Sequence, residues 1–205
     1  MDLSHYFYLS STLFANEKIW KNVNMNALPL LTVIVRALAA ARLEVVLIGN
    51  AAAALHGAPV TTLDFDFMFR QTNPNMVKLK KVARYLHAQV FAPYYPVSRL
   101  YRVVNEDMGL QVDFMATVHG IRSFESLRSR STALTMAGET LIVASLSDII
   151  ASKKAANRPR DRAVLDILEK TLHASQEENT TPKKKKQKHD TGRKQGSVGR
   201  SGEGK

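Results

Sequence analysis

The chain lacks cysteine, and it also lacks the marks of secretion and of membrane insertion. Without cysteine there is no disulfide framework. The six histidines are scattered without metal-ligand spacing, so no zinc site is expected. The most apolar stretch, residues 30–48, is interrupted by Arg36, Arg42 and Glu44, which argues against a membrane span. Residues 1–5 carry no basic segment of the kind that opens a signal peptide. We therefore expect a cytoplasmic protein with no membrane partner.

Acidic residues are in the minority, and the excess of basic residues is concentrated at one end. The net charge is +11, and residues 183–205 hold nine Lys or Arg against Asp190 and Glu203. Because this segment has almost nothing to bury, it is predicted to be disordered. It is a candidate for sequence-independent contacts with RNA or DNA phosphates. A solubilising tail and a nuclear localisation signal have the same composition and are the alternatives.

The length and composition predict one domain with additions at both ends. With 205 residues, 45% of them hydrophobic, the chain can bury a core. We place the domain at residues 25–175 and the disordered basic tail at residues 176–205. Residues 1–24 are an unassigned extension: an extra packing helix, a partner-binding segment, or an upstream addition if Met25 is the true start.

Two carboxylates one residue apart, Asp64 and Asp66, are the first candidate for chemistry. On a strand they point to one face while Phe65 and Phe67 point to the other, toward a core. Close carboxylates raise each other's pKa unless a proton or a cation neutralises them. Mg²⁺ binds carboxylates together with phosphate oxygens, so the pair predicts a metal site. An exposed edge strand with solubilising acids is the alternative.

A glycine turn precedes this pair. The apolar run 45–48 leads into Gly49 and Asn50, and the alanine-rich residues after them predict a helix that Gly57 can close. Glycine allows the backbone to approach a ligand closely. The start of a helix also attracts phosphate. The segment is therefore a candidate phosphate contact, with a plain connection between strand and helix as the alternative.

A third acid, Asp113, lies in a segment that alternates like a strand. Residues 97–104 and 110–115 flank a polar connection and predict an antiparallel hairpin. Asp113 is the lone acid on its strand, on the face opposite the apolar residues. It is a candidate third carboxylate of the same site, with a solvated strand residue as the alternative.

Periodicity predicts the remaining elements. Helical spacing covers residues 26–42 and 75–87, and residues 139–144 resemble a late strand. Ser145 and Asp148 form a capping box for a further helix. Pro159 suits the first turn of the final helix. The helix at 75–87 carries a basic run, which is either a solvated face or a surface for an acceptor backbone: Lys78, Lys80, Lys81 and Arg84.

Residues 47–66 resemble the opening motif of minimal nucleotidyltransferases of the polymerase-beta-like superfamily. In that motif a strand ends in a glycine turn, a short helix follows, and a Pro-Arg-x-Thr-x-Asp-x-Asp segment leads into the second strand. Residues 143–161 are similar to the helical part of nucleotidyltransferase-type toxins of type IV toxin-antitoxin and abortive-infection modules. The resemblance covers about residues 26 to 172.

The resemblance implies an α/β (α+β) fold, with a small mixed β-sheet flanked by helices and with C-terminal helices before the tail. It implies transfer of a nucleoside monophosphate from a nucleoside triphosphate such as ATP to an acceptor hydroxyl, with Mg²⁺ or alternatively Mn²⁺. The acceptor would be RNA, transfer RNA or a protein, with aminoglycosides as a competing class, and a cognate antitoxin is an expected partner. A non-catalytic or degenerate module that binds nucleic acid is the alternative function.

The resemblance also assigns roles to residues. The implied catalytic and metal-binding residues are Asp64, Asp66 and Asp113, and the implied nucleotide-binding residues are Gly49, Asn50, Lys153 and Asp161. Lys153 also suits the end of its helix, and Asp161 the first turn of the next, through the helix dipole alone. Asn50 replaces the second small residue of the family's turn, but it can still cap the helix and donate a hydrogen bond to phosphate. Val60 replaces the family's arginine, so compensating charge has to come from elsewhere.

Overall fold

The computed structural model describes residues 27–62, 64–92 and 100–180. The strands are β1 (Val45–Ile48), β2 (Phe65–Phe69), β3 (Gln89–Phe91), β4 (Leu100–Asn105), β5 (Leu110–Met115), β6 (Thr132–Met136) and β7 (Glu139–Val143). The helices are α3 (Ala27–Ala41), α4 (Gly49–Leu55), α5 (Asn73–Tyr85), α6 (Phe124–Ser129), α7 (Leu146–Ala156) and α8 (Pro159–Thr180). The extension at 1–24, the predicted strand start at 97–99 and the basic segment at 183–205 lie outside the described residues.

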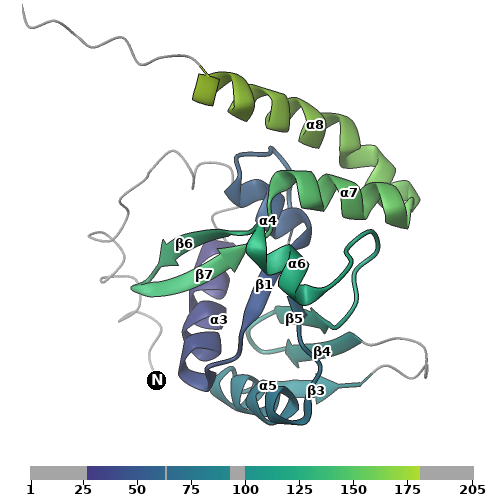
Figure 1. Ribbon diagram of the computed structural model, residues 1–205. Coiled ribbons are helices and arrows are strands. Elements are labelled where there is room, and N and C mark those ends of the chain that lie inside the picture. The colour runs from purple at the N-terminus through teal and green to yellow at the C-terminus, as the bar shows by residue number, and fades with distance from the viewer. Residues whose placement is uncertain (1–26, 63, 93–99, 181–205) are drawn as a thin grey trace, which may run out of the picture.

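The seven strands form one mixed sheet in the order β3-β4-β5-β2-β1-β7-β6 (Figure 1). The central strand β2 runs antiparallel to β1 and parallel to β5. The predicted hairpin is confirmed, since β4 and β5 pair antiparallel from Leu100 and Met115 to Asn105 and Leu110. A mixed sheet flanked by helices is the predicted fold class.

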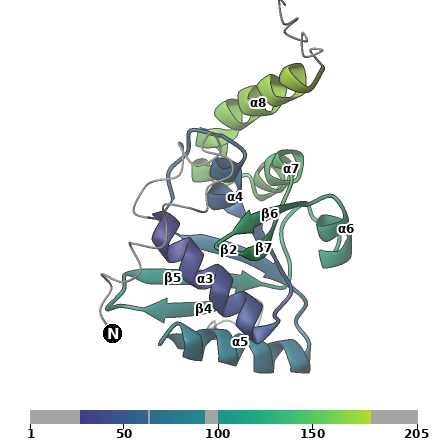
Figure 2. The same ribbon diagram turned by 90° about the vertical axis from the view of Figure 1, so that its left-hand side faces the viewer.

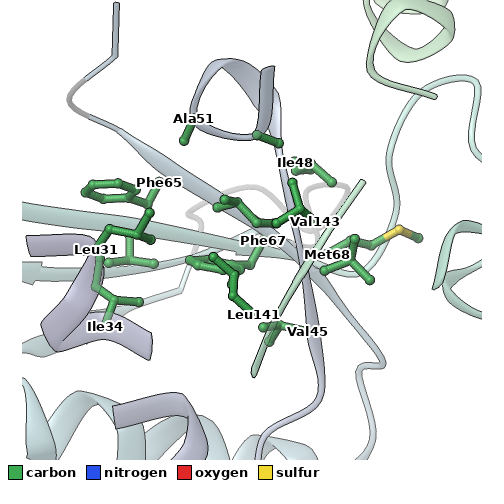
Figure 3. Close-up of a cluster of buried hydrophobic side chains, with 14 of the residues drawn as sticks. Leu31, Ile34, Val45, Ile48, Ala51, Phe65, Phe67, Met68, Leu141 and Val143 are labelled. Carbon is green, nitrogen blue, oxygen red and sulfur yellow. The ribbon is translucent and has the colours of Figure 1, made fainter. Parts of the chain in front are cut away.

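Helices α3 and α5 cover one face of the sheet (Figure 2). Four apolar residues at helical spacing on α3 are buried: Leu31, Ile34, Val35 and Leu38. They join a cluster with the sheet's aromatic side chains, in which Phe65 and Phe67 of β2 lie beside α3 (Figure 3). The rings of Phe67 and Phe114 stack with centroids 5.5 Å apart. The phenylalanines that flank the acids therefore anchor β2 from the opposite face.

The helices that follow β1 and β7 pack together near one end of the sheet (Figure 1). The imidazole Nε2 of His56 lies 2.7 Å from the main-chain oxygen of Ala144, which connects the end of α4 to the turn between β7 and α7. Ser145 caps α7 as predicted, because its hydroxyl accepts a hydrogen bond from the main-chain N–H of Asp148 at 3.2 Å, while the Asp148 carboxylate pairs with the Ser145 hydroxyl and with Arg130. These contacts fix where α7 starts relative to α4.

Several boundaries differ from those predicted. Helix α5 begins at Asn73 rather than Asn75, because the Thr72 hydroxyl caps it. Helix α4 ends at Leu55 with His56 as its C-cap, and Gly57, with a φ of +92°, closes it as predicted. Helix α8 begins at Pro159 as predicted and continues to Thr180, beyond residue 175. Three short elements, β3, α6 and β6, were not predicted. None of the helices in the described part is long and apolar enough to cross a membrane.

Removal of the Phe67 ring tests the aromatic core. We expect Phe67→Ala to lower the free energy of unfolding by about 3–5 kcal/mol, because a fully buried ring leaves a cavity against Phe114. The measurement is urea unfolding followed by circular dichroism. The control is Val77→Ala, at a position that is 57% exposed on α5, with an expected change below about 0.5 kcal/mol. Equal losses in the two variants would contradict this description of the core.

Candidate functional site

One row of side chains crosses five strands and carries the predicted acids. Asp66 of β2 is paired with Asp113 of β5 on one side and with Ile48 of β1 on the other. Asp113 is paired in turn with Arg102 of β4, and Arg102 with Phe91 of β3. Residues paired directly across neighbouring strands point to the same face. The sheet therefore places both carboxylates, a guanidinium and an aromatic ring in one line.

The surroundings of Asp66 in this row shift its pKa strongly upward. Burial raises its pKa to about 6 from 3.8, and the negative charges of Asp113 and Asp64 add to the rise. The positive charges of Lys153 and Arg160 partly oppose it. All three predicted carboxylates and two cations from the C-terminal helices therefore act on one another at this point of the sheet.

Arg102 neutralises the neighbouring acid. Its Nε and Nη2 atoms donate to the two carboxylate oxygens of Asp113, both at 2.8 Å. Only 8% of Asp113 is exposed, so a bare charge there would be costly. The hydrogen bond to Asp113 raises the pKa of Arg102 above its usual value although burial opposes this. The pair is a two-point, charge-assisted contact, the strongest type of ion-pair geometry.

Asp64 lies just before β2, so the strand itself begins one residue later than predicted. The Thr62 hydroxyl donates to the main-chain oxygen of Asp64 at 2.9 Å and so holds the chain before the strand. The Gln111 amide Nε2 lies 3.5 Å from the Asp64 carboxylate. Asp64 is exposed, and Asp66 is half-buried. The outer acid is therefore open to a ligand, whereas the inner one is held by the sheet.

Gly49 makes room for the inner acid. Its φ of +70° is in the left-handed region, and a Cβ added there would lie 2.5 Å from Oδ2 of Asp66. A side chain at position 49 would therefore displace the Asp66 carboxylate.

The prediction that Asn50 caps the following helix is wrong. Helix α4 starts at Gly49, its cap residue is Ile48, and the cap makes no side-chain hydrogen bond. Asn50 is thus inside the first turn, where its side chain is not in the capping position. Its Oδ1 atom is the only buried side-chain oxygen or nitrogen that lacks a partner in the part of the chain described. The unpaired atom is an oxygen, so only a hydrogen-bond donor, and not a phosphate oxygen, could pair with it.

Lys153 and Asp161 form a buried ion pair between α7 and α8. The Lys153 Nζ atom lies 3.4 Å from Asp161 Oδ1, and Arg158 Nε lies 2.6 Å from Oδ2. Burial alone would raise the pKa of Asp161, but the hydrogen bond and charge of Arg158 and the charge of Lys153 outweigh burial and hold that pKa below its usual value. Asp161 therefore orients Lys153, whose charge acts on Asp66.

Two residues near the acids were not predicted as site residues. Arg160, in the first turn of α8, is close enough to lower the pKa of Asp66. The other is Arg102 of β4, which binds Asp113. Val60 is buried, in keeping with a packing role. Val60 supplies no positive charge near the acids. Arg102 of β4, Lys153 of α7 and Arg160 of α8 supply it instead.

The donor set fits a divalent metal only in part. Within the described ranges no three His, Asp or Glu side chains converge as a complete metal site. Asp66 and Asp113 supply hard oxygen donors, and burial together with the neighbouring acids raises the pKa of Asp66, so its ionised form is costly until a cation neutralises it. A Mg²⁺ ion that completes its shell with substrate phosphate oxygens suits such an incomplete site.

The raised pKa of Asp66 predicts a pH-dependent stability cost. Since the folded-state value is about 6 and the ordinary value 3.8, stability is lost as the pH rises through this interval and stays lost above it. Asp66→Asn removes the ionisation, so its stability relative to wild type should grow by about 2 kcal/mol between about pH 4 and pH 8. The measurement is urea unfolding in chelator. Gln111→Ala, on the same face, should instead follow the wild-type pH profile; an Asp66→Asn profile parallel to both would disprove the expectation.

Loss of Arg102 should leave a buried charge unpaired. We expect Arg102→Gln to lower the free energy of unfolding at neutral pH by about 1–3 kcal/mol, because Asp113 keeps its burial and loses both hydrogen bonds. Arg36→Gln, at an exposed position on α3, is the matched control. Urea unfolding measures both variants, and identical midpoints for the two would show that the ion pair contributes nothing.

Comparisons with known proteins agree with this architecture. No protein-family model matches the sequence, and no curated protein matches it. The solution structure of the antibiotic-resistance factor ANT(2'')-Ia is similar to the chain with a TM-score of 0.52 and 15% identity, covering 74% of this chain and 87% of that one. The crystal structure of ANT(2'')-Ia with adenylyl-2''-tobramycin is similar with a TM-score of 0.50 and 16% identity, covering 74% and 92%. A nucleotidyltransferase-like protein from Paracoccidioides brasiliensis is 13% identical over 76% of this chain and 90% of its own, with a TM-score of 0.43. The chain has the nucleotidyltransferase fold.

Proposed function

We propose that the chain is a Mg²⁺-dependent nucleotidyltransferase that moves a nucleoside monophosphate from a nucleoside triphosphate to an acceptor hydroxyl on RNA, transfer RNA or protein. The observation that carries the proposal is the paired placement of Asp66 and Asp113 on parallel neighbouring strands, with Asp64 close enough to raise the pKa of Asp66. Repulsion between these acids costs stability, and a bound cation would relieve it.

The residues around the acids take complementary roles. Asp64 and Asp66 would hold the metal bound to the triphosphate, and Asp66 and Asp113 would hold the acceptor oxygen. Lys153 would contact phosphate, positioned by Asp161, to which it is already paired. Gly49 and Asn50 would border the triphosphate, Gly49 with an open backbone and Asn50 with its amide NH₂ group as the donor to a phosphate oxygen. When bound, Mg²⁺, or Mn²⁺ in its place, neutralises charge that develops on the transferring phosphoryl group.

The transfer is a single in-line displacement. The acceptor oxygen bonds to the α-phosphorus, the bond to the bridging oxygen of the pyrophosphate group breaks, and pyrophosphate leaves with the electron pair. The hydroxyl proton passes to a carboxylate of the Asp66 and Asp113 pair or through it to water.

A toxin role in a toxin-antitoxin module, with a cognate antitoxin as partner, is the biological form of this proposal. It is supported by the similarity of residues 143–161 to the helical part of such toxins, where a lysine contacts phosphate and an aspartate follows. In this chain the corresponding lysine and aspartate, Lys153 and Asp161, form an ion pair.

Transfer can be tested with the purified full chain, labelled nucleoside triphosphates, Mg²⁺ and total RNA. We expect labelled RNA from wild type and at least about a hundredfold less from Asp66→Asn or Asp113→Asn, because loss of a carboxylate removes several kcal/mol of transition-state stabilisation. Asp107→Asn, in the exposed turn between β4 and β5, is the control and should keep wild-type activity. A toxin would also arrest growth when expressed, unless Asp66 is replaced. If folded wild type labels neither RNA nor protein, just as Asp66→Asn does, the proposal is wrong.

One observation favours a second candidate, a non-catalytic module that binds nucleic acid. Arg102 occupies both carboxylate oxygens of Asp113, as a permanent replacement for a metal would. Calorimetric titration with Mg²⁺ and nucleoside triphosphate separates the two functions. Heat of binding that disappears in Asp66→Asn supports the enzyme, whereas no binding by folded wild type supports the non-catalytic module.

A further inference from the structure

The row that contains the acids ends in a phenylalanine open to solvent. Phe91 closes the edge strand β3 and is 51% exposed. It is paired with Arg102, which is paired with Asp113, so the three side chains follow one another along one face of the sheet. Val90, the preceding residue, points to the other face. An exposed ring is ordinary by itself, but this one lies in register with the carboxylates.

The spacing of the row suits one nucleotide. Neighbouring strands are about 4.8 Å apart, so Phe91 and Asp113 are separated by about 10 Å. A base stacked on Phe91 places its sugar above Arg102 and its terminal hydroxyl toward Asp113 and Asp66. Base stacking on an exposed aromatic ring is a common way to hold single-stranded nucleic acid.

Arg102 has capacity for a further anion. Its Nε and Nη2 atoms bind Asp113, and Nη1 has no protein partner among the residues that the structure describes. The side chain is 43% exposed. A phosphate beside the stacked base can therefore bind Nη1 while Asp113 keeps its two hydrogen bonds.

Charge around the row favours a polyanion. Strands β3, β4 and β5 contain one acid, Asp113, and Arg102 already neutralises it. Helix α5, which leads into β3, has no acid, and its cations form no ion pair within the described ranges: Lys78, Lys80, Lys81 and Arg84. A hollow of about 530 Å³ at its end is lined by Ala40, Lys81, Arg84, Tyr85 and His87. These cations lie with α5 on the face of the sheet opposite the row, and the edge strand β3 separates the two faces. Nucleic-acid phosphates that pass around β3 would find several cations there.

We propose that Phe91 and Arg102 form the acceptor subsite and that the acceptor is the 3′ end of a single-stranded polynucleotide; this rests on the proposed function. The terminal base stacks on Phe91, the adjacent phosphate binds Arg102, and upstream phosphates pass around the edge strand β3 to the basic face of α5. The 3′ oxygen bonds to the α-phosphorus of the triphosphate, its proton leaves to a carboxylate, and pyrophosphate is released. The product is the same strand, longer by one nucleotide.

The test uses the full chain and fluorescent single-stranded RNA and DNA oligonucleotides with free 3′ hydroxyls. Anisotropy without triphosphate gives the Kd, and gel analysis with triphosphate and Mg²⁺ gives extension by one nucleotide. Phe91→Ala should weaken binding of the oligonucleotide about tenfold, and Phe91→Tyr should retain binding, because stacking needs only the ring. The KM for the triphosphate should not change. Val90→Ala, on the same strand but the opposite face, is the matched control.

A second pair of variants tests the basic face of α5. Replacing both Lys81 and Arg84 by glutamine should reduce the slope of log affinity against log salt by about one to two, since each phosphate contact contributes about one. Arg36→Gln, on the exposed side of α3, should leave the slope unchanged. A preference for RNA over DNA, or equal use of both, supports the proposal and identifies the source of the strand.

Three results would overturn it. Equal Kd values for Phe91→Ala and Val90→Ala would show that no base stacks on Phe91. An unchanged salt slope in the α5 variant would show that the strand makes no phosphate contacts with α5. Transfer by wild type to protein or aminoglycoside but not to oligonucleotides would remove this acceptor while leaving the nucleotidyltransferase proposal standing. Absence of triphosphate turnover with every acceptor, by contrast, is the failure of the proposed function itself.

Discussion

Repulsion between carboxylates on adjacent strands is the constraint around which the rest of the site is arranged. The parallel register of β2 and β5 places Asp66 beside Asp113, and burial makes their charges more costly. Each neighbouring feature lowers that cost: Arg102 binds one acid, and the charges of Lys153 and Arg160 act on the other. The stacked phenylalanines on the reverse face hold the strands in register against this repulsion. The close approach of these acids thus lowers folding stability and concentrates negative charge at one place, as in sites that bind cations.

Much of this arrangement follows from local patterns in the sequence. Alternation along the strands predicts that Asp66 and Asp113 oppose buried phenylalanines, and the structure agrees. The hairpin also determines the partner of Arg102: once Asn105 pairs with Leu110, Arg102 must pair with Asp113. The pairing of Arg102 with Asp113 could therefore be predicted from the register of the hairpin. By contrast, β3 and β6 are short and mostly exposed, so they carry no apolar periodicity that could reveal them.

Other parts of the site depend on tertiary packing and could not be predicted from spacing. The ion pair of Lys153 and Asp161 bridges two helices, and its distance from Asp66 is set by how α7 packs on α4 and α8. The expected cap at Asn50 failed because the helix starts at Gly49, which places Asn50 inside the first turn. Position 60 shows the same dependence on packing. Val60 is a buried apolar residue, and the positive charge near Asp66 comes from Lys153 and Arg160, which are distant in sequence.

The contact between Gly49 and Asp66 has a consequence for variation at this site. The space that a methyl group would need at position 49 is already filled by a carboxylate oxygen from another strand. Positions 49 and 66 therefore behave as one unit under selection: while the acid is retained, natural drift and mutagenesis libraries alike should recover only glycine at 49. In a chain that has lost the acid at position 66, asparagine could also occupy position 49, because only the left-handed backbone would still restrict that position. The identity of residue 49 in related chains thus records whether their ancestors kept a charged centre.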